Sequence, residues 1–296
     1  MEQGRFMNAR RMEEGNPSQQ YVLPVRDFLT DEEQVKTVVL RYLTLEKFIS
    51  LLELEAMWFS RLGALQDKFE GTVPNGARAR ILELEKDRER SEKMLGSGLL
   101  RYLSNTVNAG RNDPARVGVA VNCWFSGQDE SEKMWREYGQ GGKGVAIRST
   151  VKRLSTSFHI TGDYVKISAV GRVQYVDFES HEMTARDAND VNRVAFIKGK
   201  KDFESEQEVR IITMNCLHSG CLAPDGNPVS SYQLTGPGLF DPNRKGFYVK
   251  CKIQELIQAV IVGPSAQPNF ITLIKRLVRR YGLLVQVESS RLLPKQ

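Results

Sequence analysis

Short segments rich in β-branched and other apolar residues recur along the whole chain, and helices do not alternate with them in a strict order. The segments Val35–Tyr42, Val117–Ser126, Glu206–Thr213 and Ala259–Val262 have the composition of β-strands. A doubly wound parallel sheet needs a helix between successive strands, and this chain lacks that regular alternation. The sequence therefore predicts an α+β protein with mixed, mainly antiparallel sheets and packed helices.

The chain carries no linker rich in Pro, Gly and Ser that would divide its 296 residues into separate domains. We predict a partly disordered N-terminal arm over residues 1–34 and a single α+β domain over residues 35–296. The stretch from Ala77 to Val107 is heavily charged in its first half, which is typical of an exposed helix. We therefore predict a helical insertion at about residues 77–110.

Further elements follow from local patterns. Thr44 stands before apolar residues at helical spacing and is expected to cap the helix that follows. Ala56–Ser60 is expected to form a second short strand. The remaining predicted elements are helices at Glu130–Tyr138, Met183–Lys200 and Asn269–Tyr281, strands at Val145–Arg148, Val165–Val176, Gly246–Ile253 and Leu283–Val287, and a long loop at Cys216–Asn243.

Composition restricts the compartment and the partners. No apolar run approaches the ~20 residues of a membrane span, and no apolar segment of a secretory signal follows the first charged residues. Four cysteines in so long a chain do not indicate a disulfide scaffold. We predict a cytoplasmic protein with no membrane partner. The net charge of +6 permits an anionic partner without requiring one, and no known nucleic-acid module is recognisable.

The sharpest chemical signal is the pair Glu206 and Glu208. On a strand, alternate side chains share a face, so the two carboxylates are expected to project together, about 7 Å apart. Each would then raise the pKa of the other or bind a cation, and Arg210 would partly neutralise them. The alternative is a solvated strand face with a cross-strand salt bridge.

Other polar and aromatic residues stand at the ends of predicted elements. Arg41, near the end of the first strand, has a planar donor fork suited to a phosphate, or it is a surface arginine. The hydroxyl of Ser60 can contact a ligand at the end of the second strand. Trp135 and Tyr138 lie three apart on a predicted helix and can stack on a planar ring or belong to the core. Glu70, like Asp67, fits a turn before a helix.

Two motifs are rejected. The glycine-rich run Gly139–Gly144 leads from a helix into a strand, whereas a phosphate-binding loop leads from a strand into a helix with Ser or Thr after its lysine. Cys216, His218 and Cys221 lack the second ligand pair of a zinc site. We predict no bound metal.

Several segments, taken in order, resemble a bacterial family known as domain of unknown function 2971. The resemblance runs from about residue 36 to the C-terminus. Gln66 stands where the family has Asn, and Lys68 where it has Pro; both are expected in a turn away from the chemistry. The matching segments are Leu40-Arg41-Tyr42, Leu45–Ser60, Gln66–Glu70, Met134–Gly139, Lys143–Ile147 and Lys200–Arg210.

The same order of elements is similar, more distantly, to ADP-ribosyltransferases, which have Arg or His on a first strand, Ser or Tyr ending a second, and Glu-x-Glu on a late strand. The resemblance implies an ADP-ribosyltransferase-like fold with NAD as substrate and no metal. Arg41 would hold an NAD phosphate, and Ser60 would orient the glutamate or contact the nicotinamide ribose. Glu208 would bind the ribose 2′-hydroxyl and stabilise the transition state, and Glu206 would steer the acceptor. The residues that would stack on the nicotinamide are Tyr42, Trp135 or Tyr138.

These observations leave more than one function open. The first is an ADP-ribosyltransferase or NAD glycohydrolase, a toxin or anti-phage defence effector that modifies a nucleic acid or a protein and is restrained by an antitoxin or another regulatory protein. It predicts that Arg41, Ser60 and Glu208 converge in one cleft. The alternative is a non-catalytic module of the same fold that binds nucleic acid or another anion. Its basic residues would be Lys275, Arg276, Arg279 and Arg280. A metal-dependent nuclease is a third reading.

Overall fold

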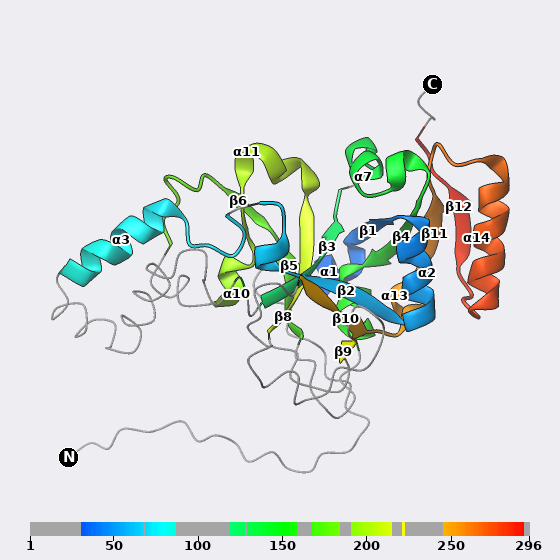
Figure 1. Ribbon diagram of the computed structural model, residues 1–296, viewed down its shortest axis with the longest axis horizontal. Coiled ribbons are helices and arrows are strands. Elements are labelled where there is room, and N and C mark those ends of the chain that lie inside the picture. The colour runs from blue at the N-terminus through cyan, green and yellow to red at the C-terminus, as the bar shows by residue number, and fades with distance from the viewer. Residues whose placement is uncertain are drawn as a thin grey trace, which may run out of the picture.

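A mixed sheet runs through the centre of the molecule, with helices packed around it (Figure 1). The structure is a computed structural model that describes residues 31–67, 69–86, 116, 119–127, 129–158, 167–183, 191–214, 221–222 and 245–292. Within these residues the large sheet has ten strands, and every pair in it is antiparallel except β11 with β12. The predicted α+β class with mixed, mainly antiparallel pairing is therefore confirmed.

The strands have the following bounds. Those of the large sheet are β1 (Val38–Leu43), β2 (Ala56–Arg61), β3 (Val119–Phe125), β4 (Val145–Thr150), β5 (Ile167–Arg172), β8 (Glu208–Met214), β9 (Cys221–Leu222), β10 (Gly246–Lys250), β11 (Ala259–Val262) and β12 (Gln286–Ser289). A separate two-stranded parallel sheet consists of β6 (Gln174–Val176) and β7 (Ile197–Gly199).

The helices are mostly short. The α-helices are α1 (Asp31–Lys36), α2 (Leu45–Leu54), α3 (Asn75–Lys86), α7 (Glu132–Glu137), α8 (Val151–Ser157), α10 (Val191–Val194), α11 (Lys200–Phe203), α13 (Ile253–Leu256) and α14 (Pro268–Arg280). The 3₁₀ turns are η1 (Leu62–Ala64), η3 (Gln140–Gly142) and η4 (Glu204–Glu206). Helix α3 lies at one end of the long axis and α14 at the other (Figure 1). None of the helices in the described part of the chain combines the length and the apolar character that a membrane span requires.

Local sequence explains where the main elements begin. Thr44 caps α2 as predicted, because its hydroxyl accepts a hydrogen bond from the backbone N–H of Lys47 at 3.4 Å. Helix α14 starts with Pro268, whose fixed φ suits a first turn. The buried apolar side of α14 includes Ile274 and Val278, which pack into the largest cluster of the core.

The glycine-rich run forms the tight turn η3 between α7 and β4. Gly142 has φ of +83°, a conformation that L side chains rarely adopt. A Cβ on Gly144 would meet the carbonyl oxygen of Leu43 at 2.2 Å, so this position admits no side chain. The glycines therefore allow the start of β4 to lie close to the end of β1. This structural role agrees with the rejection of the run as a phosphate-binding loop.

Strand β3 is the point at which the sheet divides. It pairs with β8 along its whole length. On its other edge it pairs with β2 at Ala120 and Val121, and with β1 at Phe125. Strands β1 and β2 therefore share one edge of β3 and diverge between Val121 and Phe125.

Several predicted boundaries change in the structure. Helix α1 (Asp31–Lys36) overlaps the end of the predicted N-terminal arm and replaces the start of the first predicted strand, while residues 1–30 lie outside the described residues. The predicted helix Met183–Lys200 is wrong at Ile197–Gly199, which form β7 beside β6. Of the predicted helical insertion at about residues 77–110, only the part that belongs to α3 is described, and the next described residue is Arg116. Most of the predicted loop Cys216–Asn243 also lies outside the described residues.

Candidate functional site

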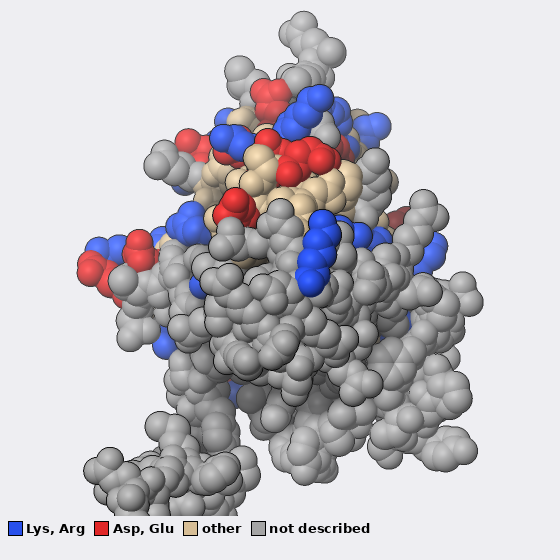
Figure 2. All heavy atoms as spheres, turned by 90° about the vertical axis from the view of Figure 1, so that its left-hand side faces the viewer, with Lys and Arg blue, Asp and Glu red and all other residues tan. Residues whose placement is uncertain are grey.

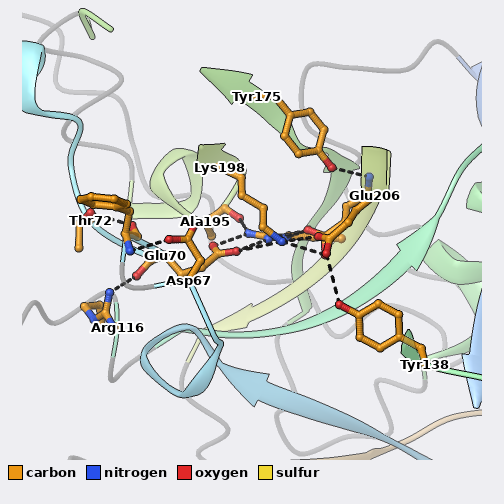
Figure 3. A network of polar contacts seen from close by, with 12 residues as sticks. Asp67, Glu70, Thr72, Arg116, Tyr138, Tyr175, Ala195, Lys198 and Glu206 are labelled. Carbon is orange, nitrogen blue, oxygen red and sulfur yellow. Dashed lines mark hydrogen bonds and ion pairs between the residues drawn. The ribbon is translucent and has the colours of Figure 1, made fainter. Parts of the chain in front are cut away.

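Arg210 on β8 is the centre of a buried ionic network. Figure 3 shows other members of this network, among them Glu70, Lys198 and Glu206. Arg210 is fully buried, and all five of its N–H donors have an acceptor. Its Nη atoms donate to both oxygens of Glu70 at 2.9 and 2.6 Å, and to the carbonyl oxygen of Ala195 at 2.7 Å. Nε and Nη2 donate to one oxygen of Glu208 at 2.8 and 2.6 Å. The guanidinium thus fixes two carboxylates that are far apart in the sequence.

Lys198 on β7 joins the same carboxylates to a third. Its Nζ lies 2.5 Å from Glu206 Oε2, and 3.6 Å from both Glu70 Oε1 and Glu208 Oε1. The ammonium group also lies 4.3 Å from the ring centroid of Phe203, in α11. The three glutamates therefore surround two cations inside the protein.

The backbone around Gln207 explains how Glu206 and Glu208 converge. The prediction that both lie on one strand face is wrong, because β8 begins at Glu208 and Glu206 belongs to η4. Between them Gln207 has φ of +40°, a left-handed conformation that turns the chain. Both carboxylates still reach Lys198, but through a turn followed by a strand. Neither is solvated, since Glu206 is 4% and Glu208 9% exposed.

Charge determines the protonation state of Glu208. Burial alone would raise the pKa of Glu208, but the nearby Arg210 and Lys198 lower it below the ordinary value. Of the two expectations for the glutamate pair, a raised pKa or the binding of a cation, Glu208 follows the second, because it pairs with Arg210 and Lys198. Burial would lower the pKa of Lys198, whereas the surrounding carboxylates raise it overall. Glu208 and Lys198 are therefore both ionised at neutral pH.

Arg41 lies beside this network at the division of the sheet. Its Nη1 donates to the carbonyl oxygen of Cys123, which belongs to the part of β3 that neither β1 nor β2 pairs. Burial lowers the pKa of Arg41, while the charge of Glu208 raises it. Arg41 Nε is buried and has no hydrogen-bond partner among the described residues. With Arg41 counted, three cations balance three carboxylates.

Cys123 lies between Arg41 and the ionic network. It pairs across the strands with Arg210. Burial raises the pKa of its thiol to about 12, and the charge of Glu208 adds to the effect. The thiol is therefore protonated at neutral pH, which makes Cys123 a poor nucleophile.

Two tyrosines border the network. The hydroxyl of Tyr138 donates to Glu206 Oε1 at 3.3 Å, and this residue is 43% exposed. The hydroxyl of Tyr175 accepts a hydrogen bond from the backbone N–H of Glu208 at 2.9 Å. Tyr138 stands at one side of the cluster with its hydroxyl toward Glu206 (Figure 3), and its partial exposure connects the buried carboxylates to solvent.

The other predicted ligand contacts lie elsewhere. Tyr42 is 5% and Trp135 2% exposed, and their rings pack edge to face with centroids 4.8 Å apart. This burial favours a core role for both over stacking on a nicotinamide. Ser60 lies in β2, and its hydroxyl accepts from the indole N–H of Trp58 at 3.0 Å. No contact in the described part of the chain joins Ser60 to Arg41 or Glu208.

Sequence reasoning misses Glu70 and Lys198 as members of the site. Glu70 lies in the turn expected to be remote from the chemistry, yet it is 1% exposed and binds Arg210 through two hydrogen bonds. Its presence in a segment that resembles a known family is the one available signal. Lys198 falls inside a predicted helix, where a single lysine after an apolar run gives no sign of burial.

The carboxylate oxygens of the network, which are the atoms that could bind a metal ion, are paired with cationic side chains of the protein. Each of the three carboxylates lies within ion-pair distance of Lys198, and Glu70 and Glu208 also bind Arg210. Among the residues that the structure describes, no group of three or more His, Cys, Asp or Glu is arranged to hold a metal ion. The charge of the network is balanced by side chains of this chain.

The comparisons with known proteins include a match to a family model. The model of the family described as "Protein of unknown function (DUF2971)" matches residues 134–211. That segment holds Lys198, Glu206, Glu208 and Arg210, whereas Arg41, Ser60 and Glu70 precede it. No curated protein and no solved structure matches the chain. Over residues 134–211, the chain is therefore similar to the DUF2971 family.

Proposed function

We propose that the chain is an NAD-consuming enzyme, an ADP-ribosyltransferase or an NAD glycohydrolase, with Glu208 as its central carboxylate. The observation that carries the proposal is the fixation of Glu208 in its ionised form by Arg210 and Lys198. Arg41 lies close enough for the charge of Glu208 to raise its pKa. The substrate comes from the resemblance to ADP-ribosyltransferases, and so does the proposed fold family, into which a mainly antiparallel sheet fits.

The chemistry needs a fixed negative charge. When the bond between ribose C1′ and the nicotinamide nitrogen breaks, the electron pair leaves with neutral nicotinamide and positive charge develops on the ribose. A carboxylate held in place beside that charge stabilises the transition state more than the ground state. Because Arg210 uses two donors on Glu208, the carboxylate loses little additional conformational entropy during the reaction.

The neighbouring residues have roles that suit this reaction. The buried Nε of Arg41 has no hydrogen-bond partner among the residues that the structure describes, and its guanidinium would bind the NAD pyrophosphate. Of the three predicted aromatic contacts, Tyr138 is the exposed one, and its ring would lie against the nicotinamide. Glu206 would hydrogen-bond the acceptor that attacks C1′, which is water in the hydrolase and a side chain or nucleic acid in the transferase. The attacking group loses its proton to solvent in either case.

The test compares matched variants for NAD consumption. Purified protein is incubated with NAD and cellular extract, and both nicotinamide release and transfer of labelled ADP-ribose are followed. We expect wild type to be active and Glu208→Gln to lose at least about a hundredfold, because one electrostatic contact to a transition state contributes on that order. Glu204→Gln, a neighbouring exposed carboxylate, serves as the control and should keep wild-type activity.

Binding and chemistry are separated by a second variant. Arg41→Lys keeps the charge and removes the planar fork, so we expect KM for NAD to rise with little change in kcat. Circular dichroism verifies that each variant is folded. If wild type consumes no NAD with any extract, or if folded Glu208→Gln is as active as wild type, the proposal is wrong.

A further inference from the structure

Helix α14 presents one exposed side that carries only one sign of charge. All of its exposed residues lie on that side, and they are Pro268, Asn269, Thr272, Leu273, Lys275, Arg276, Arg279 and Arg280. No carboxylate occurs anywhere in the helix. The opposite side packs into the main core, so α14 is held rigidly while its basic side faces solvent.

The four cations form two rows along the helix. Lys275 and Arg279 are four residues apart, as are Arg276 and Arg280, so the members of each row are about 6 Å apart along the axis. Within the described residues, no ion pair or side-chain hydrogen bond joins any of the four to a carboxylate. At the end of the helix, Glu53 accepts a hydrogen bond from the hydroxyl of Tyr281.

Helix stability does not explain this arrangement. Basic residues in the last turn interact favourably with the helix dipole, which accounts for Arg279 and Arg280. Like charges four residues apart destabilise a helix, however, and α14 keeps two such pairs. A surface that serves solubility normally mixes both signs. The described part of another face, shown in Figure 2, does carry acidic and basic residues side by side.

We propose that the exposed side of α14, defined by Lys275, Arg276, Arg279 and Arg280, is a docking surface for the phosphodiester backbone of double-stranded DNA. Three of the four residues are arginines, whose planar forks match phosphate oxygens in pairs. A helix of this width also fits against the major groove of B-form DNA, whereas the major groove of duplex RNA is too narrow for side chains. This inference does not rest on the NAD chemistry.

Other anionic partners fit the surface less well. A helix that binds a membrane surface must insert its apolar side, and in α14 that side is occupied by the core. Single-stranded nucleic acid needs aromatic platforms for its bases, and the exposed residues of α14 include none. Because the surface offers contacts to phosphates, we expect binding without sequence preference.

The experiment measures binding of a labelled DNA duplex to the full chain by fluorescence anisotropy over a range of salt concentrations. In the test variant, Lys275, Arg276, Arg279 and Arg280 are all changed to Gln. The control variant removes the same charge elsewhere, through Lys47→Gln, Arg136→Gln, Lys200→Gln and Lys201→Gln, all at exposed positions. Thermal unfolding verifies that both variants keep the wild-type fold.

We expect wild type to bind the duplex with a strong salt dependence, and the test variant to bind at least about tenfold more weakly. The slope of log K against log salt should become shallower by about 0.9 for each phosphate that the test variant no longer neutralises. The control variant should stay close to wild type. The proposal is overturned if wild type does not bind at low salt, or if the two variants weaken equally. It is also overturned if duplex RNA, single-stranded DNA or anionic phospholipid vesicles compete as well as duplex DNA does.

Discussion

At the scale of single residues, Arg210 controls the electrostatics of the candidate site. A buried guanidinium is unfavourable unless its donors and its charge are satisfied. Glu70 and Glu208 supply the charge, and the carbonyl of Ala195 accepts the fifth hydrogen bond. The loss of any one partner therefore leaves an unsatisfied group in the interior.

Replacing Glu70 tests this dependence. Glu70→Gln keeps the shape of the side chain and removes a charge that is completely buried against Arg210. We expect the free energy of unfolding to fall by about 3 kcal/mol, the lower end for a broken buried ion pair, because Glu208 remains to balance Arg210. Urea denaturation with an unchanged m-value measures the difference.

The control for this prediction is an exposed ion pair nearby. Glu204 lies 3.7 Å from Lys200, and both side chains are more than half exposed. Glu204→Gln should change the free energy of unfolding by less than about 0.5 kcal/mol. Equal effects of Glu70→Gln and Glu204→Gln would mean that the buried network contributes no more than a surface pair.

Residue types predict part of the site. The pattern Glu206-Gln207-Glu208 with Arg210 indicates paired charges. It could be predicted because all of these residues lie within five consecutive positions. Glu70 and Lys198 are not predicted as members of this site. Glu70 meets Arg210 only through the tertiary fold, across a separation of 140 residues. Contacts of this kind leave no local pattern, so a single sequence cannot place them.

At the scale of elements, the turn before β8 sets the direction of both glutamates. Gln207 adopts a left-handed conformation with φ of +40°, and its carbonyl accepts from both the backbone N–H and the hydroxyl of Ser126. Those contacts anchor the turn to the end of β3. Glu206 then reaches Lys198 from the turn, while Glu208 reaches Arg210 from the strand.

A β-branched residue at Gln207 should disturb this turn. The left-handed region is disfavoured for β-branched residues and tolerated by Asn. We expect Gln207→Val to lower the free energy of unfolding by about 1 kcal/mol, and Gln207→Asn to leave it nearly unchanged. Denaturant midpoints of the two variants measure this difference. If Val and Asn are equally tolerated, the conformation of the turn is not constrained by its contacts.

Strands with uniform apolar composition are predicted well from the sequence, and those that depend on a partner are not. The predicted strand Ala259–Val262 has the same bounds as β11, because four buried β-branched or small residues stand between Gln258 and the pair Gly263-Pro264. Ile197–Gly199 falls within a predicted helix. These three residues form a strand because β6 pairs with them in parallel, which is a tertiary interaction.

At the scale of the whole molecule, the site lies at the division of the central sheet. Strand β3 pairs with β8 along one edge and with β2 and then β1 along the other edge. This topology brings Arg41 of β1 close to Glu208 of β8. The three carboxylates and three cations come from segments between residues 41 and 210. The network therefore joins distant parts of the chain, and its ionisation should affect global stability.

The pH dependence of unfolding tests this link. The folded protein lowers the pKa of Glu208 below 4.5, so its carboxylate stabilises the fold fully above that pH, and the contribution is lost as the pH falls through the folded value. Wild type should therefore have a larger free energy of unfolding than Glu208→Gln at neutral pH, and this difference should become smaller below pH 4.5. Urea denaturation at several pH values measures the difference.

The control variant is Glu204→Gln, whose free energy of unfolding should stay close to that of wild type at each pH. A difference between wild type and Glu208→Gln that does not change with pH would mean that Glu208 acts through its shape and hydrogen bonds, and that its charge does not contribute.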